Sequence, residues 1–202
     1  GLGDVYKRQV LVDTIFASFL STGSPTWLYL SDRLIQFPMC LFGVAIALVA
    51  LPDITELYIK KDSKNFNKTF LRGSLSTLLL GLATMIFYLF FSAEIISLLF
   101  ERGEFQEFDV AMTSASLVAY AYALPFLLNS KFFNSIFFAI SKTKFVLLLG
   151  IVSLFINLLL NYLFIFIFGM GHVGLALATT CAALIVWLLS IIFLIYLRKS
   201  LA

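Results

Sequence analysis

Residues 27–51 constrain the fold of this chain more than any other stretch, because they are almost continuously apolar and yet contain a charged pair. A helix needs about 20 apolar residues to cross a bilayer, so the stretch is long enough to span a membrane. Asp32 and Arg33 would then lie within or near the membrane. A central Arg or Asp costs about 2.5–3.5 kcal/mol on insertion scales, so we expect the pair to face a polar cavity or a partner.

Three polar side chains share one face of this helix. Tyr29 and Arg33 are four residues apart, and Gln36 follows three residues later. Pro38 removes a backbone hydrogen bond directly after them and is expected to bend the helix. A bent membrane helix with Arg33 and Gln36 on one face predicts a transporter that handles an anion. The alternative is that Arg33 extends to the lipid headgroups or pairs locally with Asp32.

The composition identifies an integral membrane protein and excludes several functions. The chain is 61% hydrophobic and 12% charged, whereas a soluble domain is about 25% charged. A net charge of +3, scattered along the chain, does not indicate nucleic-acid binding. Cys40 and Cys181 lie in apolar runs and are interpreted as packing residues. His172 has no second His or Cys nearby, so a metal-dependent or nucleophilic enzyme site is not expected.

The hydrophobic runs predict an all-α polytopic helix bundle with one partial and five full transmembrane helices. The expected spans are residues 10–20 (partial), 27–51, 73–100, 110–140, 145–168 and 175–197. Pro52 and Asp53 are predicted to end the second span. The polar residues 53–72 are expected to lie in part as an amphipathic helix on the membrane surface. Pro125 interrupts the fourth span.

The connections between these spans alternate in charge. Basic side chains occur at residues 60–72, 142–144 and 198–199, whereas residues 21–26, 101–109 and 169–174 are neutral or acidic. The positive-inside rule places the basic connections and the C-terminal Arg198 and Lys199 in the cytoplasm.

The first nine residues carry a separate hypothesis. The sequence DVYKRQ at residues 4–9 back-translates to a nucleotide sequence that resembles the end of a common transposase sequencing adapter. We therefore interpret residues 1–9 as an assembly artefact, to be left out of fold reasoning. Residues 10–202 would then be a fragment of a longer transporter.

Several segments, in their order and spacing, resemble the MurJ (MviN) family of lipid II flippases. The family belongs to the multidrug/oligosaccharidyl-lipid/polysaccharide (MOP) exporter superfamily. The segments are VDTIFASFL at 12–20, DRLIQFP at 32–38, FGVAIA at 42–47, LFERGEF at 99–105 and GLALATT at 174–180. The resemblance implies the C-terminal lobe of a MATE-like bundle, from the end of the family's seventh helix to its twelfth.

The resemblance implies a transporter that moves lipid II, the pyrophosphate-linked peptidoglycan precursor, from the inner to the outer leaflet by alternating access. Arg33 matches a cavity arginine of the family, and its guanidinium suits phosphate oxygens. Tyr29, Asp32 and Gln36 complete the implied substrate site. The implied setting is the bacterial cytoplasmic membrane, with lipid II and membrane lipids as partners, a monomeric protein and no required cofactor.

Two other functions are weighed against this one. The first is a related exporter of another lipid-linked oligosaccharide, such as O-antigen, or of a drug. The second is a membrane-embedded enzyme of lipid-linked sugars, which needs clustered acidic or His residues near one membrane face. Here the only acidic cluster is the loop at 101–109, which is interpreted as a solvated loop or a lid.

Lys131 and Asn134, near the end of the fourth span, either face the cavity or extend to the headgroups.

A sodium ion is a candidate ligand away from the substrate site. Asn157 and Asn161 continue a polar stripe that starts at Ser153, at four-residue spacing on an apolar helix. Asp13 is an intramembrane carboxylate, and Thr179 opens the last helix. Such oxygen ligands suit a hard cation. The resemblance implies the same, because Asp13, Asn157, Asn161 and Thr179 match sodium ligands of some members. The alternative is that these side chains form hydrogen bonds between helices.

Overall fold

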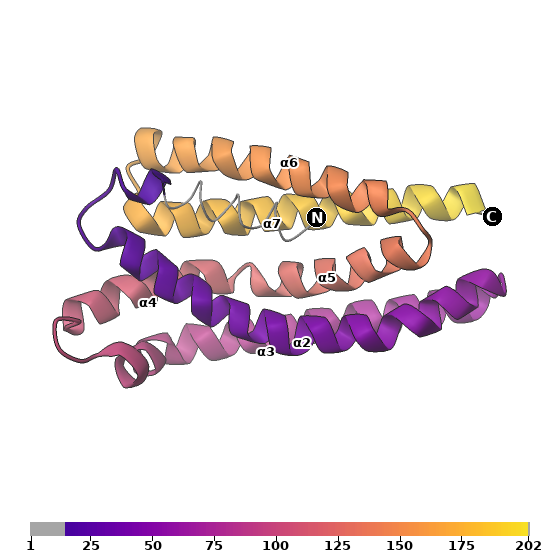
Figure 1. The fold of residues 1–202 in the computed structure, drawn as a ribbon, viewed down its shortest axis with the longest axis horizontal. Helices are drawn as coiled ribbons and strands as arrows, with labels where there is room; N and C mark the ends of the chain where they lie inside the picture. Colours follow the sequence, from indigo (N-terminus) through magenta and orange to yellow (C-terminus); the bar gives the residue numbers. More distant parts are fainter. Residues whose placement is uncertain (1–14, 202) are drawn as a thin grey trace.

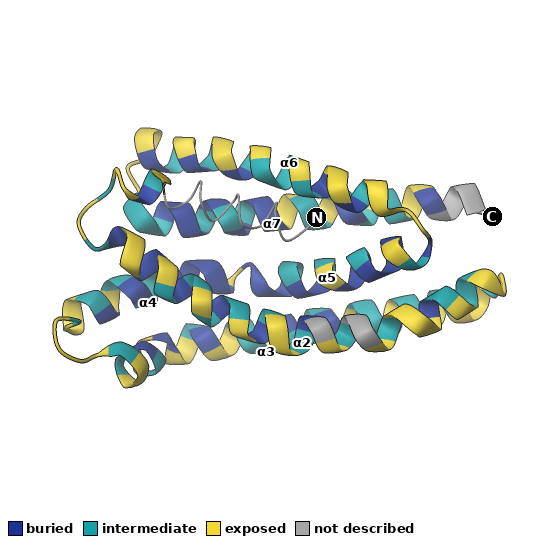
Figure 2. Cartoon of the chain, viewed as in Figure 1, coloured by how far each residue is buried: buried dark blue, intermediate teal, exposed yellow. Residues whose placement is uncertain are grey.

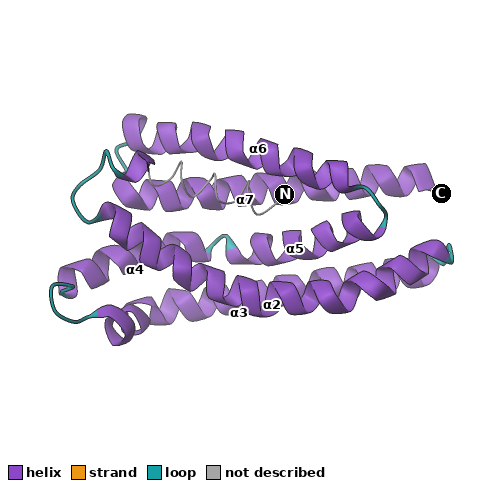
Figure 3. Ribbon diagram, in the orientation of Figure 1, coloured by secondary structure: helices purple, strands orange, loops and turns teal. Residues whose placement is uncertain are grey.

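The computed structural model describes residues 15–201, excluding the side chains of residues 44, 47, 48 and 198–201. Helices and the loops between them make up this part of the chain (Figure 3). The predicted all-α fold is therefore confirmed. Asp13 and residues 1–9 lie outside the described residues.

The helices run back and forth along one axis, with short connections at both ends (Figure 1). They are α2 (Ser24–Ile59), α3 (Ser63–Phe100), α4 (Glu107–Ala121), α5 (Leu124–Ala139), α6 (Thr143–Tyr162), the π-helical turn η1 (Leu163–Ile167) and α7 (Gly171–Leu201). Helices α4 and α5 lie between the α2–α3 pair and the α6–α7 pair in this view.

The basic connections share one end of the bundle. The α2–α3 turn, the α5–α6 turn and the end of α7 all lie on the right in Figure 1, whereas the start of α2 and the α3–α4 loop lie on the left. The predicted alternation of basic and non-basic connections is thus confirmed as an arrangement in space. Below, the two ends are called the basic end and the non-basic end.

Three helices in the described part of the chain are long and apolar enough to span a membrane, namely Ser63–Phe100, Thr143–Ile167 and Gly171–Leu197. Helices α4 and α5 pass the same test together and are bent by 46° at their junction. Helix α2 is not among the helices that pass, although its length of 36 residues exceeds the roughly 20 that a span requires. These three helices and the bent pair overlap the four spans predicted between residues 73 and 197.

The bend between α4 and α5 follows from Pro125, which has no backbone N–H and starts α5. The backbone N–H of Ala123 bonds to the carbonyl of Tyr120 at 2.9 Å instead of reaching Ala119, four residues back. Thr180 on α7 supplies the missing partner, because its hydroxyl donates to the Ala119 carbonyl at 2.7 Å. A side chain from another helix thus makes the predicted interruption compatible with an apolar setting.

The prediction that Pro52 ends the second helix is wrong. Helix α2 continues through Pro52 to Ile59, about two further turns. Ile54 is only 1% exposed and packs in the same apolar cluster as Phe132 and Phe133 of α5. Burial of Ile54 therefore compensates for the backbone hydrogen bond that Pro52 cannot form.

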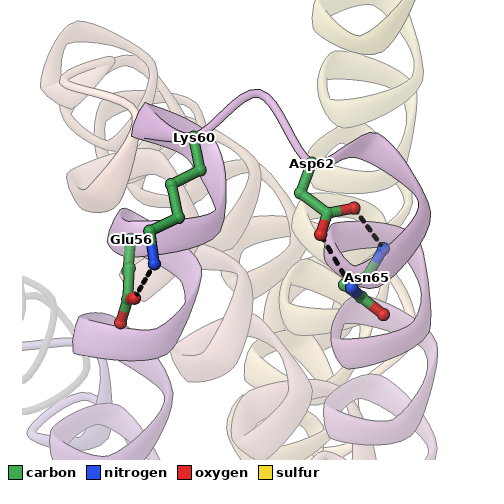
Figure 4. Close-up of polar contacts among 4 residues, drawn as sticks. All are labelled: Glu56, Lys60, Asp62 and Asn65. Carbon is green, nitrogen blue, oxygen red and sulfur yellow. Dashed lines mark hydrogen bonds and ion pairs between the residues drawn. The ribbon is translucent and has the colours of Figure 1, made fainter.

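The prediction of an amphipathic surface helix in residues 53–72 is also wrong, because this segment forms the end of α2, a tight turn and the start of α3. Two local contacts order the turn (Figure 4). Lys60 donates to the Glu56 carboxylate at 2.5 Å, which lowers the pKa of Glu56 and raises that of Lys60. Asp62 accepts from the backbone N–H of Asn65 at 3.1 Å, and these contacts with Asn65 lower the pKa of Asp62.

The buried residues form two apolar clusters along the bundle, on the helix sides that face one another (Figure 2). The cluster toward the non-basic end includes Leu28, Ile35, Ile96 and Leu117. The cluster toward the basic end is rich in aromatic residues and includes Phe132, Phe133, Phe137, Val146 and Leu197. Buried polar contacts between α3, α5 and α7 lie at the junction of the two clusters.

Candidate substrate-binding face and cation site

Helix α2 packs against α3 and α4 with one face and exposes the opposite face. On the packed face, Trp27, Leu28 and Ile35 are buried. The Ser31 hydroxyl is 2.8 Å from the carbonyl of Thr113 on α4, and Tyr88 of α3 donates its hydroxyl hydrogen bond to the Leu34 carbonyl at 2.7 Å. These contacts anchor the helix against α3 and α4. The opposite face is left available for a ligand or for another part of the protein.

Arg33 lies on the exposed face, where its guanidinium carbon is 4.8 Å from the centroid of the Tyr29 ring. This is a cation–π arrangement across one helical turn, and it places the two predicted site residues together. Arg33 forms no ion pair with any described residue. Tyr29 is 52% exposed. The aromatic ring thus holds the guanidinium in place without occupying its hydrogen-bond donors.

Asp32 and Gln36 form a second pair beside the first. The Gln36 side-chain amide donates to the Asp32 carboxylate across one turn. Both residues are half-buried. The structure therefore brings the four predicted residues together on two adjacent rows of α2, with the cation on the more exposed row.

The exposed face of α2 continues as an apolar surface toward the basic end. Large exposed side chains follow Arg33 at four-residue spacing, namely Phe37 and Leu41. Lys131 of α5 is exposed and lies at the flank of α2, because a Cβ atom at Gly43 would be 3.5 Å from its Cγ. Lys131 is therefore a second cation beside α2, about 15 Å along the helix from Arg33 at 1.5 Å per residue.

Three of the four predicted sodium ligands meet between α6 and α7. The amide of Asn157 donates to the Thr179 hydroxyl at 3.0 Å, and the amide of Asn161 donates to the Asn157 carbonyl oxygen at 3.1 Å. Both asparagines are fully buried. The fourth predicted ligand, Asp13, lies outside the described residues.

The donor set of this cluster suits a hard cation, because Asn157 and Thr179 supply amide and hydroxyl oxygens. The same atoms form a continuous chain of hydrogen bonds between the two helices. The cluster is therefore compatible both with a sodium site and with hydrogen bonds between the helices. A buried sodium ion would also need a carboxylate to balance its charge.

Sequence reasoning missed an aromatic cluster at the non-basic end. The Trp27 indole donates to the Asp109 carboxylate at 2.8 Å, and the ring of His172 lies edge-on at 4.9 Å between centroids. Gly23 precedes α2 with a φ of 101°, where a Cβ would come within 2.7 Å of the Trp27 ring. These contacts join the ends of α2, α4 and α7, two residues before Tyr29. The partners are 82 residues apart, so no local pattern could reveal them.

Known proteins support one family. The family model described as lipid II flippase MurJ matches residues 6–202. A probable lipid II flippase MurJ of Vibrio cholerae is 37% identical over 179 residues, which cover 89% of this chain and 34% of that protein. A probable lipid II flippase MurJ of Haemophilus influenzae is 35% identical over 185 residues, which cover 89% of this chain and 36% of that protein.

Solved structures give the same result. A lipid II flippase MurJ in an inward closed conformation is similar with a TM-score of 0.84 and 29% identity, over 94% of this chain and 40% of that chain. An outward-facing MATE transporter of the MOP superfamily has the same fold, with a TM-score of 0.84 and 18% identity over 98% of this chain and 43% of the other. The chain spans about one third of the length of the curated relatives. The chain belongs to the MurJ family of lipid II flippases.

Proposed function

We propose that this chain forms part of one lobe of a transporter that moves lipid II from the inner to the outer leaflet of the bacterial cytoplasmic membrane. The observation that carries this proposal is the exposed Arg33 on the Tyr29 ring, on a helix whose opposite face is fixed by buried contacts. In this proposal the transporter acts as a monomer, and residues outside this chain form the other wall of the cavity.

The chemistry of the face fits the headgroup of such a substrate. A pyrophosphate presents several oxygens, and the planar guanidinium binds two of them at once. The cation–π contact with Tyr29 limits the orientations that Arg33 can adopt, which reduces the entropy lost on binding. Gln36 donates to the Asp32 carboxylate, so one carboxylate oxygen is turned toward an amide N–H and not toward an anion beside Arg33.

The fold of this chain is compatible with alternating access. Its fold agrees equally well with an inward closed MurJ and with an outward-facing MATE transporter, at a TM-score of 0.84 in both cases. In this proposal the lobe moves as a unit against the rest of the transporter. Transport would then expose Arg33 first to one side of the membrane and then to the other.

The test is complementation of a flippase-depleted strain by the full-length protein that contains this chain. Arg33→Ala should abolish growth at normal membrane abundance, because it removes an exposed phosphate contact without opening the packed core. Arg33→Lys should restore growth only in part, since Lys is a point charge. Arg102→Ala is the matched control, because Arg102 is exposed in the α3–α4 loop. Full growth with Arg33→Ala would overturn the proposal.

A reconstituted assay separates lipid II from the cargo of related exporters. Vesicles that contain the purified full-length protein should translocate fluorescent lipid II, and Arg33→Ala should reduce the rate at least tenfold. Translocation of another lipid-linked oligosaccharide but not of lipid II would place the protein with a sibling exporter. Movement of neither lipid would contradict a lipid-linked cargo.

We also propose that Asp13 joins Asn157, Asn161 and Thr179 to bind sodium. The proposal is supported by the buried oxygen cluster between α6 and α7 and by its chemistry. Sodium should raise the unfolding temperature of the purified full-length protein relative to N-methyl-glucamine, and both Asp13→Asn and Asn157→Ala should remove this increment.

The control for the sodium experiment is Ser153→Ala, one turn before Asn157 on the same helix. Sodium should raise the unfolding temperature of Ser153→Ala by as much as it raises that of the wild type. Equal stability of the wild-type protein in the two salts would leave only the hydrogen-bonding role for this cluster.

A further inference from the structure

The outward face of α3 changes from basic to apolar along one continuous row. Lys68 and Arg72 are exposed near the basic end, and Leu75, Leu79 and Leu82 follow on the same side of the helix at spacings of three and four residues. All three leucines are exposed. Cations therefore lead directly into an apolar surface without a change of helix face.

The apolar part of this row forms one wall of a groove with a volume of about 510 Å³. Tyr122 and Phe126 form its floor at the α4–α5 junction, and Cys181 and Leu184 of α7 form the other wall. The groove lies at the depth of the α4–α5 junction, where the pair is bent by 46°. Pro125, which interrupts the span, is itself one of the residues that line the groove.

Within residues 15–201, Lys68 and Arg72 are the cations at this end of α3 that have no carboxylate partner. Lys60 is paired with Glu56 (Figure 4). Lys64 interacts electrostatically with Asp62, whose pKa it helps to lower. Neither Lys68 nor Arg72 forms an ion pair with any described residue. Two available positive charges thus stand directly beside the end of the groove.

The dimensions match a lipid of one leaflet. Arg72 and Leu75 are one turn apart, about 5 Å along the axis. The groove follows α3 from Leu75 to Met85, about 15 Å at 1.5 Å per residue. This length is half of a hydrocarbon core of about 30 Å. An acyl chain that starts at Arg72 would thus end near the middle of the bilayer.

We propose that this face binds one anionic phospholipid of the cytoplasmic leaflet, with its phosphate on Lys68 and Arg72 and one acyl chain in the groove. Charge complementarity selects an anionic headgroup, and the apolar lining selects the chain. The site is separate from Arg33, which lies on α2 toward the other end of the bundle. Only the choice of leaflet rests on the proposed orientation of the transporter.

The first test is native mass spectrometry of the purified full-length protein with phosphatidylglycerol or phosphatidylcholine. Phosphatidylglycerol should be retained preferentially. Lys68→Ala with Arg72→Ala should lower its affinity about 25-fold, at about fivefold for each cation near a lipid surface. Lys142→Ala with Lys144→Ala is the matched control, because these cations lie at the same end but away from the groove. Equal retention of the two lipids, or equal effects of the two pairs, would overturn the proposal.

The second test locates the acyl chain. Phosphatidylglycerol with a diazirine in its chain should cross-link to α3 and α7 at the groove, and Leu79→Trp should reduce this labelling by filling the space. Leu148→Trp, on the exposed side of α6, is the control. Absence of groove cross-links would overturn the proposal and indicate that another helix of the full-length protein covers the groove. Arg33→Ala should leave lipid binding intact, so failure of this site is distinguishable from failure of the transport function.

Discussion

The indole N–H of Trp187 on α7 donates a 2.7 Å hydrogen bond to the side-chain oxygen of Asn129 on α5. The amide of Asn129 in turn donates to the Thr77 hydroxyl of α3 at 2.6 Å and to the Ser74 carbonyl at 2.9 Å. Asn129 is completely buried. One amide therefore ties three helices together at the junction of the two apolar clusters.

Removing either partner should destabilise the protein to different extents. Trp187→Phe removes one hydrogen bond, and an interhelical hydrogen bond in a membrane protein contributes about 0.6 kcal/mol and at most about 1.7 kcal/mol. Asn129→Leu should cost more, about 2–3 kcal/mol, because it removes the hydrogen bonds to Thr77 and Ser74 as well and leaves the half-buried Trp187 indole without its acceptor. The measurement is reversible unfolding of the purified full-length protein. Asn134→Leu on the same helix is the control, since Asn134 is half-buried and forms no hydrogen bond with the described residues. Equal losses for the two leucine variants would contradict this role of Asn129.

Features that depend on local sequence could be predicted. The alternation of basic and non-basic connections follows from charge counting, and the Tyr29–Arg33 contact follows from helical spacing. Pro125 marked the bend between α4 and α5. Pro52 did not end its helix, because packing of Ile54 against α5 outweighs the missing hydrogen bond. The position of a proline in the sequence predicts the loss of a backbone hydrogen bond, but it does not reveal the tertiary contact that offsets this loss.

Contacts between distant residues could not be predicted. Trp187 and Asn129 are 58 residues apart, and each lies in a run without a pattern that identifies a partner. The Asn157–Thr179 contact could be predicted, because the sequence places both residues at a comparable depth in consecutive spans. The groove beside Leu79 could not, since residues of α3, the α4–α5 junction and α7 line it together.

Gly81 allows α3 to approach α5 closely. A Cβ at this position would lie 2.9 Å from the backbone nitrogen of Pro125 and would also overlap its Cα. Gly81→Ala should therefore push the two helices apart and lower the free energy of unfolding by about 1–3 kcal/mol, as overpacking of a tight interface does. Thermal unfolding of the full-length protein provides the measurement.

Gly43→Ala is the matched control for Gly81→Ala. A Cβ at Gly43 would meet the flexible Lys131 side chain at an ordinary distance of 3.5 Å. Alanine is the better helix former by about 1 kcal/mol, so this change should leave stability unchanged or raise it. A loss for Gly43→Ala as large as that for Gly81→Ala would show that helix approach is not the cause.

The Asp62 cap at the start of α3 should make stability depend on pH at the acidic end. Contacts with Asn65 lower the pKa of this carboxyl below its ordinary value of 3.8. Its contribution is therefore fully present above pH 3.8 and is lost as the pH falls through the lowered pKa. Asp62→Asn keeps a capping oxygen but cannot titrate.

The difference in the free energy of unfolding between wild type and Asp62→Asn, measured from pH 6 to pH 3, should shrink as the pH falls. A constant difference would contradict the assignment. The effect should also be small and weaker in high salt, because the carboxyl is solvated.

The orientation in the membrane gives the final prediction. The three basic connections lie at one end of the bundle (Figure 1), so the positive-inside rule allows only one orientation. Single cysteines are introduced at Lys64 and Glu104, both exposed, in a variant without Cys40 and Cys181. In intact cells a membrane-impermeant maleimide should label Glu104→Cys, whereas Lys64→Cys should react only after permeabilisation. Labelling of Lys64→Cys alone in intact cells would reverse the orientation. Labelling of both would contradict the separation of the two ends by a membrane, because the 38 residues of α3 connect them.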